Sequence, residues 1–398
     1  MSQQQDLRPV ARARALAAQI AAASAAIERT RRIPAPLMQA LHRARLFRLL
    51  LPLSVGGEQS EPAAYLAAIE ELARHDASVG WNVFVANSAA LIAAYLELRT
   101  AQALFADPAA LVAWGPPNGV RALAVAGGYR VSGTWHFASG CREASWMGAH
   151  CLVADAAGAL RLEATGRPVI RTLLFPRQQA TLIDNWNAIG LRGTGSDSYS
   201  VTELFVPEAL SCTREDPTLR REPAPLYAFT MQGLYAVGVA GVALGLARAM
   251  LDALIALAHS KAPRGRARLA DDPLVRAEVA RAEARLGAAG AYLRETLTSI
   301  HAGAGATAPI AIAERARPPR VHAGDSRGDC RGRRQLQGRG RGCNRARWPV
   351  RAALSRHAHV VAADPGARRA FRGRRPGAAR GAPGGVPLTK SRAGAHRR

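Results

Sequence analysis

The sequence is poor in residues that form disulfides or bind metal ions. Its five cysteines are an odd number among 398 residues, and none of them stands in a C-x-x-C or Cys/His ligand spacing. This usage argues against a disulfide framework and a structural zinc site, and it is typical of a reducing compartment. We therefore expect a cytoplasmic protein without a metal site.

Three further signals are missing. Residues 1–7 lack a cationic segment followed by an apolar run, so no secretory signal is expected. Neither a G-x-G-x-x-G fingerprint nor a Walker loop occurs, so nicotinamide cofactors and ATP are not expected through those motifs. The apolar run from Leu226 to Ala247 could cross a membrane by its length. Gln232 interrupts it, and its spaced glycines suit a helix bundle, so we expect no membrane span.

Positive charge is abundant but confined to one segment. The formal net charge is +25, and residues 318–398 hold 21 Lys and Arg against 3 Asp and Glu, or +18. Residues 1–317 carry the remaining +7. A strongly basic balance points to nucleic acid when it belongs to the folded domain. Here it is a property of the C-terminal segment alone.

Apolar spacing predicts helices over residues 1–112. An Ala-rich run covers 11–31, a second helix begins at Pro34 and extends to residue 46, and a third covers 62–73. Asp76 or Ser78 can cap the next helix, in which apolar residues recur at spacings of three and four. Residues 1–112 are therefore predicted to form an N-terminal helical domain.

The periodicity changes from 3.6 to 2 after residue 111. Residues 129–137 alternate apolar and polar side chains, which predicts a half-buried strand, and further strands are expected at 146–153, 169–175 and 199–206. We predict a β domain over 113–213. Helical spacing returns at 226–259 and 274–301, so residues 214–317 are predicted to form a C-terminal helical bundle. The order of helices, strands and helices favours an α+β fold.

Residues 318–398 show no periodicity and are rich in Arg, Gly, Ala and Pro. One interpretation is an Arg/Gly-rich arm that binds nucleic acid. The other is a reading frame shifted by one base near Arg317, because GC-rich codons read out of frame give this composition. In the shifted frame, residues 348–358 can encode G-P-F-E-R-R-F-R-D-M-H and residues 320–345 an Ala-rich amphipathic helix. We favour the frameshift because it restores the helical pattern, and we expect the tail as written to be disordered.

Four motifs within residues 10–300 resemble those of a known family. They are Leu46-Phe47-Arg48 with Pro52 and Gly56-Gly57, the run 72–81 (LARHDASVGW), the run 133–140 (GTWHFASG) and the run 190–196 (GLRGTGS). In this order they resemble the acyl-CoA dehydrogenase superfamily, and within it the flavin-dependent monooxygenase branch that includes hydroxyphenylacetate and dibenzothiophene monooxygenases. The resemblance implies a helical N-terminal domain, a barrel-like β domain and a C-terminal bundle that this chain holds only in part.

The resemblance also implies a flavin site. An isoalloxazine needs an apolar slot and a few backbone or hydroxyl donors. By resemblance, Ser139 bonds to the flavin, aromatic residues of the same strand shape its site, and Arg268 reaches a neighbouring subunit's flavin phosphate. The predicted cofactor-binding residues are Trp114, Gly115, Trp135, Phe137, Ser139, Gly140, Arg192, Gly193, Thr194 and Arg268. No catalytic residue is assigned in the frame as written.

Simpler interpretations exist for several of these residues. From the pattern alone, Trp135 and Phe137 fit an ordinary strand core equally well. The glycines of 190–196 let backbone amides approach a ligand, but they also suit a plain turn. Arg268 belongs to a basic loop, and such loops are commonly solvated. His75, His136 and His150 show no metal spacing and are interpreted as structural.

The function implied by the resemblance is that of the oxygenase component of a two-component monooxygenase. It would receive reduced FMN or FAD from a separate flavin reductase, use O2 on a small organic substrate, and assemble as a homotetramer. An acyl-CoA dehydrogenase is the alternative, but it needs a carboxylate to remove the α-proton, and Glu295 has no context that marks it as that base. A second alternative, nucleic-acid binding through residues 318–398, is not favoured.

The chain as written is predicted to be catalytically impaired. The shifted-frame R-D-M-H holds a histidine that, in the monooxygenase branch, faces flavin and substrate. The lost helices would also cover the apolar face of residues 274–301, and exposing that face costs on the order of several kcal/mol at about 25 cal/mol per Å². Sequencing the gene near Arg317 and expressing both frames tests this. Equal solubility, assembly and activity of the two versions would contradict the frameshift.

Overall fold

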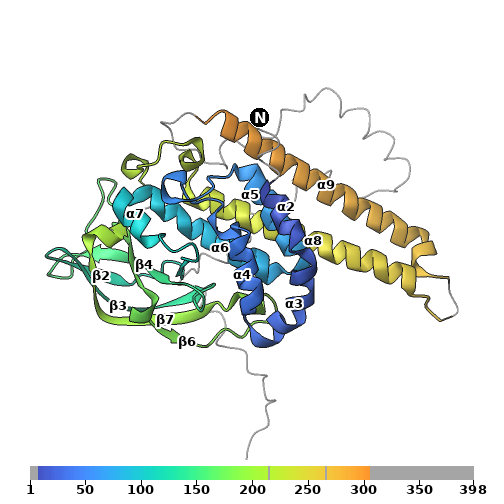
Figure 1. Cartoon of the computed structure of the whole chain (residues 1–398), viewed down its shortest axis with the longest axis horizontal. Coiled ribbons are helices and arrows are strands. Elements are labelled where there is room, and N and C mark those ends of the chain that lie inside the picture. The colour runs from blue at the N-terminus through green and yellow to red at the C-terminus, as the bar shows by residue number, and fades with distance from the viewer. Residues whose placement is uncertain (1–7, 214–215, 265–266, 305–398) are drawn as a thin grey trace, which may run out of the picture.

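The computed structural model describes residues 8–213, 216–264 and 267–304. Their helices and strands follow one another in the predicted order, with helices first, a sheet in the middle and two long helices at the end (Figure 1). The α+β class is therefore confirmed. The last short N-terminal helix ends at Leu104 and the first strand begins at Val112. The domain limits stay predictions, and the predictions for 318–398 lie outside the described residues.

Between residues 8 and 104 the structure describes six α-helices: α2 (Arg8–Ala15), α3 (Ala17–Thr30), α4 (Ala35–Arg43), α5 (Pro62–His75), α6 (Ala77–Ala90) and α7 (Leu98–Leu104). The prediction of one helix over 11–31 is wrong, because α2 and α3 meet at Leu16 with a bend of 57°. The Ala-rich run contains no helix breaker that could have indicated the bend. Tertiary packing accompanies it, since α2 lies against α5 and Arg12 donates to Glu58 at 2.6 Å.

Helix α6 begins at a side-chain cap. Asp76 Oδ1 accepts hydrogen bonds from the backbone N–H groups of Ser78 at 2.8 Å and Val79 at 3.1 Å. Its other oxygen accepts from Ser24 Oγ at 2.8 Å, which ties the cap to α3. Asp76 is therefore the cap, and Ser78 supplies one of the orphan N–H groups that the first turn of a helix leaves.

The middle of the chain forms one mixed sheet. Its strands are β1 (Val112–Trp114), β2 (Arg121–Val125), β3 (Gly128–Ala138), β4 (Trp146–Ala154), β5 (Ile170–Pro176), β6 (Thr181–Ile183), β7 (Asp197–Pro207) and β8 (Ser211–Cys212). The order is β6-β7-β3-β2-β4-β5-β8, and β1 pairs with β4 in parallel. All four predicted strands are present as β3, β4, β5 and β7.

Two 30-residue helices, α8 (Met231–Ser260) and α9 (Pro273–Ala302), complete the described chain. The first half of α8 lies among the N-terminal helices, whereas its second half runs beside α9 away from the body (Figure 1). Among the described residues, two helical segments could cross a membrane by length and composition, 77–95 and 231–260, and the bent pair of α2 and α3 would be a third if it formed one span. The most apolar window of the first is 78% buried inside the protein, but that of the second is only 33% buried. Within the described part of the chain, helix α8 therefore keeps an uncovered apolar surface.

Glycines let α8 approach α5 and α6 closely. A Cβ on Gly238 would lie 2.5 Å from Phe84 Cδ2, and one on Gly245 would lie 2.3 Å from the Glu70 carbonyl oxygen. Contacts this short do not occur for real side chains, so the helix axes can come together only where the side chain is a hydrogen atom. The predicted role of these glycines in close helix packing is thus confirmed.

Replacing Gly245 with Ala should destabilise the protein by about 1–3 kcal/mol, although Ala is intrinsically the better helix former. The added methyl group would meet the backbone of α5, which cannot move without shifting the helix. Gly287→Ala on α9 is the matched control, since no atom lies within 4 Å of its Cβ position. That change should stabilise by about 0.5–1 kcal/mol. Urea unfolding measures the change in the free energy of unfolding for both variants. Equal changes would contradict the packing argument.

Candidate functional site

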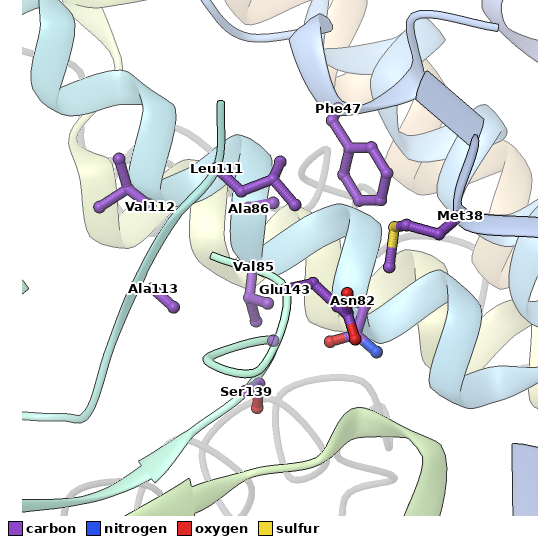
Figure 2. A pocket seen from close by; sticks show the side chains of 11 residues that line it. Met38, Phe47, Asn82, Val85, Ala86, Leu111, Val112, Ala113, Ser139 and Glu143 are labelled. Atoms are coloured by element: carbon purple, nitrogen blue, oxygen red, sulfur yellow. The ribbon is translucent and has the colours of Figure 1, made fainter. Parts of the chain in front are cut away.

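A small cavity lies where α6 meets the turn after β3. Its wall combines apolar side chains with three polar residues, and the labelled side chains converge on it from α4, α6, the start of β1 and that turn (Figure 2). The lining residues are Met38, Phe47, Asn82, Val85, Ala86, Leu111, Val112, Ala113, Ser139, Gly140 and Glu143. The enclosed space is about 10 Å³, room for roughly one water molecule, so the cavity marks where apolar and polar groups converge and does not itself hold a larger ligand.

A chain of hydrogen bonds leads from this cavity into the protein. Ser139 Oγ and Ser196 Oγ are 2.7 Å apart, Ser196 Oγ and Thr194 Oγ1 are 2.7 Å apart, and Thr194 Oγ1 lies 2.8 Å from the Leu191 carbonyl oxygen. At the other end Trp81 Nε1 donates to Ser139 Oγ at 3.1 Å. We call these residues the hydroxyl relay.

The carbonyl at the end of the hydroxyl relay fixes its direction. A carbonyl oxygen only accepts, so Thr194 must donate its single hydroxyl hydrogen to the Leu191 carbonyl oxygen. Ser196 must then donate to Thr194, and Ser139 must donate to Ser196. Because Ser139 already accepts from Trp81, one lone pair of its oxygen remains for a ligand. Ser139 was expected to be a donor, and the hydroxyl relay makes it an acceptor instead.

Asn82 contributes a second acceptor. Its amide nitrogen donates to the Gly193 carbonyl oxygen at 3.1 Å, and the residue is 6% exposed. Within the described residues Oδ1 has no hydrogen-bond partner. Gly140 lies next to it with φ +76°, and a Cβ there would be 3.3 Å from Oδ1. A glycine is therefore favoured beside this oxygen for both its backbone angle and its size.

Glu143 is the acidic residue of the cavity wall. Arg32 Nε donates to its Oε1 at 2.6 Å, so the carboxylate is held by an ion pair. Nearby, the ring of His42 packs on that of Phe47 with centroids 4.6 Å apart and a tilt of 40°, and burial is the main cause that lowers the pKa of the His42 imidazole. Within the described residues no group of three His, Cys, Asp or Glu side chains could hold a metal ion.

Two of the buried thiols, Cys141 and Cys151, are poor nucleophiles at neutral pH. Burial, with a further contribution from Asp197, raises the pKa of Cys141 to about 12. Burial alone raises the pKa of Cys151 to about 12. Because the thiolate is the reactive form, both side chains act as small apolar groups of the core.

The two aromatic residues predicted on β3 differ in their surroundings. Trp135 is fully buried, stacks on Tyr199 at 5.3 Å and donates to the His150 carbonyl oxygen at 3.3 Å. It is thus part of the sheet core. Phe137 is 60% exposed, has φ +60° and meets the Trp186 ring edge to face at 6.2 Å. Of the two, Phe137 has a face available to a ligand.

Gly115 and Trp114 lie at the end of β1. A Cβ on Gly115 would be 2.2 Å from the His136 carbonyl oxygen, so this crossing of two backbone segments requires glycine. The Trp114 ring packs edge to face on His150 at 4.9 Å. His150 is itself buried and bonded to Thr172 at 2.8 Å. These contacts explain the residues as parts of the fold, and a flavin contact stays a prediction.

The glycine-rich segment serves packing as well. A Cβ on Gly193 would lie 2.0 Å from Ile27 Cγ2 and 3.0 Å from Ser78 Cβ, so α3 and α6 close over it. Arg192 donates to the Glu28 carbonyl oxygen at 3.1 Å and pairs with its carboxylate at 3.2 Å. Thr194 belongs to the hydroxyl relay. The segment therefore attaches the β domain to the helices, and a direct ligand contact stays a prediction.

Arg268 lies in the loop between α8 and α9. Its side chain is 60% exposed and pairs with Asp271 at 3.3 Å. Of the predicted cofactor residues, the structure brings Ser139 and Gly140 to the cavity, and Thr194 lies two hydrogen bonds behind Ser139 in the hydroxyl relay. The role of Arg268 toward a neighbouring subunit stays a prediction.

Sequence reasoning missed Asn82 and Glu143. A polar residue inside the apolar run of α6 was the only signal for Asn82, and nothing marked Glu143 among the charged residues. The side chains of Trp81 and Ser196 stood inside the quoted motifs, but no role was assigned to them. Their roles depend on contacts between segments 57 or more residues apart in the chain.

Comparisons with known proteins agree with the fold and motifs. Family models match the acyl-CoA dehydrogenase N-terminal domain over residues 1–100 and its C-terminal domain over residues 237–326. The oxygenase subunit HsaA of a flavin-dependent monooxygenase from Rhodococcus jostii is 31% identical over 322 residues, covering 74% of this chain and 78% of the relative. The oxygenase component of an FADH2-dependent resorcinol hydroxylase from Rhizobium is 31% identical and covers 66% of each chain.

A solved structure gives the same result. The crystal structure of the HsaA monooxygenase from Mycobacterium tuberculosis superposes with a TM-score of 0.69 at 27% identity, covering 78% of this chain and 81% of that one. This structure supports the same family as the family models and the two relatives. The chain belongs to the acyl-CoA dehydrogenase superfamily, in its branch of flavin-dependent monooxygenases.

Proposed function

We propose that the protein is the oxygenase component of a two-component monooxygenase, which takes reduced FMN or FAD from a separate reductase and oxygenates a small organic substrate with O2. The observation that carries this proposal is the hydroxyl relay. It presents an acceptor oxygen, Ser139 Oγ, at the edge of an apolar cavity. The family relatives named as oxygenase subunit or component support the separate reductase.

The residues present fit a reduced flavin better than an oxidised one. Reduced flavin carries a hydrogen on N5, whereas the same nitrogen of oxidised flavin can only accept. The acceptor oxygen of Ser139 would therefore receive a hydrogen bond from the N5–H group of reduced flavin. With oxidised flavin, two acceptors would face each other. When bound, reduced flavin would supply the two electrons that reduce one oxygen atom of O2 to water while the other atom is transferred to the substrate. Ser139 would bond to the flavin edge, Ser196 and Thr194 would set the direction of its hydroxyl, and the apolar wall would exclude water.

The acyl-CoA dehydrogenase alternative lacks a suitable carboxylate among the described residues. Glu295 is exposed on α9 and pairs with no feature of the cavity. Glu143 does line the cavity, but Arg32 holds its carboxylate at 2.6 Å. An ion-paired carboxylate is a weaker base for a carbon-bound proton than a desolvated, unpaired one. The monooxygenase is therefore the better supported function.

The uncovered surface of α8 supports assembly into a homotetramer. Leu246, Met250, Leu254 and Leu257 follow helical spacing along its second half and are 41–66% exposed. Such a stripe must be covered by protein or by lipid. Arg248, Asp252 and Glu283 form ion pairs beside it, which favours protein, so no membrane association is proposed. The proposed compartment is the cytoplasm.

Ser139→Ala should weaken the binding of reduced flavin by about 0.5–1.5 kcal/mol, or roughly two- to tenfold, because one acceptor is lost. Ser196→Ala should leave Ser139 in place but remove the acceptor of the Ser139 hydroxyl hydrogen. Ser139 could then donate to the flavin, so the affinity for oxidised flavin should rise relative to that for reduced flavin. Anaerobic titration with reduced and oxidised FMN and FAD measures both effects. Ser132→Ala is the control, because that serine bonds to Glu203 on the exposed side of the sheet.

The same samples test the activity. After anaerobic binding of reduced flavin, O2 is admitted and the rate of flavin oxidation is followed by stopped flow. An oxygenase should change that rate when a substrate is present, and acyl-CoA should not bleach oxidised flavin. Bleaching by acyl-CoA would favour the dehydrogenase, and no binding of reduced flavin by the frame-corrected chain would contradict the proposal.

Met250→Glu should lower the mass of the assembly, because a charge in a buried apolar contact is strongly unfavourable. Size-exclusion chromatography with light scattering on the frame-corrected chain measures it. Leu162→Glu is the control, since Leu162 is similarly exposed, at 60%, but lies in the β domain. A wild-type monomer would contradict the assembly proposal, as would a tetramer that Met250→Glu leaves intact.

A further inference from the structure

Asp197 is a buried carboxylate that holds three segments of the chain together. It is 1% exposed and directly follows Ser196 of the hydroxyl relay, at the start of β7. Arg142 Nε donates to its Oδ2 at 2.5 Å. The backbone N–H groups of Asn185 and Trp186 donate to its Oδ1 at 3.2 and 3.0 Å. A charge can be buried in a protein only when it is paired and hydrogen-bonded in this way, so both oxygens serve the protein itself.

The ion pair of Asp197 joins the same two segments as the first contact of the hydroxyl relay. Arg142 lies three residues after Ser139. Asp197 lies one residue after Ser196, and the two serine oxygens are 2.7 Å apart. A displacement of either segment would therefore lengthen both contacts. The ion pair fixes the distance that lets Ser139 donate its hydrogen to Ser196.

The backbone pairing of β3 with β7 is irregular just before this point. Between two register pairs β3 advances by three residues and β7 by two: Trp135–Tyr199 and Ala138–Asp197. Such a bulge disrupts the ladder locally, and Phe137 within it has φ +60°. Beyond the bulge, Gly140 N–H donates to the Thr194 carbonyl oxygen at 2.9 Å. That bond alone would let the turn rotate about it, so the ion pair of Asp197 holds the register of the turn.

The same carboxylate holds a second predicted flavin contact through Trp186. The Trp186 ring meets Phe137 edge to face at 6.2 Å, and its Nε1 donates to the Leu191 carbonyl oxygen at 3.1 Å. That carbonyl is the acceptor at which the hydroxyl relay ends. Asp197 is thus connected to the exposed ring of Phe137 and to both ends of the hydroxyl relay.

We propose that Asp197 is a positioning residue for the flavin, because it holds the hydroxyl group of Ser139 and the ring of Phe137 in their places. This inference rests on the proposed function, since it assigns both of those side chains to the flavin. With the carboxylate in place, the Ser139 hydrogen is directed to Ser196 and its oxygen accepts from reduced flavin. Without the carboxylate, the Ser139 hydroxyl can turn and donate, and the preference for reduced over oxidised flavin is lost.

Asp197→Asn in the frame-corrected full chain tests the proposal. The new amide can still accept from the backbone of Trp186, but its nitrogen cannot accept from Arg142. The affinity for reduced FMN or FAD relative to the oxidised form should fall roughly two- to tenfold, the range expected for one hydrogen bond. A tenfold fall lowers the midpoint potential of the bound flavin by about 30 mV, because two electrons are transferred. A purely structural change would weaken both oxidation states equally and leave this potential unchanged.

Asp184→Asn is the matched control, because Asp184 accepts from the same Arg142 at 3.0 Å but is 62% exposed. Its loss should leave the potential unchanged. The double variant Asp197→Asn with Arg142→Gln leaves no unpaired charge buried, so it should fold and show the same fall. Adding Ser196→Ala to Asp197→Asn should lower the potential no further, because both changes release the same hydroxyl group.

A preference for reduced flavin that persists in folded Asp197→Asn or in the double variant would overturn the proposal. A further fall on adding Ser196→Ala would also overturn it. So would failure of both variants to fold, because Asp197 would then serve the fold alone. A wild-type chain that does not prefer reduced flavin would instead contradict the proposed function, and this inference with it.

Discussion

The placement of helix α6 is the constraint on which the site depends. It contacts α5, α8, β1 and the two short turns at Leu46–Arg48 and Arg192–Thr194. Polar groups fix it in these contacts: Asp76 at its start, Trp81 and Asn82 toward the β domain, and Asn87 toward the turn at Leu46. A buried hydrogen bond is directional, whereas apolar packing tolerates sliding. The helix therefore holds the segment 191–196 and the turn at Ser139 in one register.

This arrangement explains why the motifs are rich in small residues. Gly193, Gly115 and Gly245 each occupy a point where another backbone or side chain approaches to 2.0–2.3 Å of the Cβ position. They serve the approach of protein to protein. Ser139, Ser196 and Thr194 are small enough to line up in a chain of 2.7–2.8 Å hydrogen bonds. At Gly193, close packing and the hydroxyl relay thus have the same origin, the near contact of α6 with the β domain.

The sequence predicted the elements better than the site. The alternation at 129–137 and the helical spacing at 274–301 are local signals, and both elements are present within a residue or two of the expected limits. The bend at Leu16 accompanies contacts between distant segments, and the exposure of Phe137 accompanies a shift in the β3–β7 register between Trp135 and Ala138, so local periodicity could not predict either. The acceptor role of Ser139 depends on the Leu191 carbonyl, 52 residues further along the chain. Asn82 and Asn87 look alike in the sequence, and only their partners separate them.

The basic charge of the chain and its enzymatic site belong to different segments. Residues 318–398 carry +18 of the net charge of +25, whereas the motifs, the cavity and the hydroxyl relay all lie before residue 200. The family match to the C-terminal domain ends at residue 326, close to Arg317, where the helical period disappears from the sequence. The match therefore extends past Arg317 into the segment that already carries the basic composition. The frameshift near Arg317 stays a prediction, which the gene sequence at that point decides.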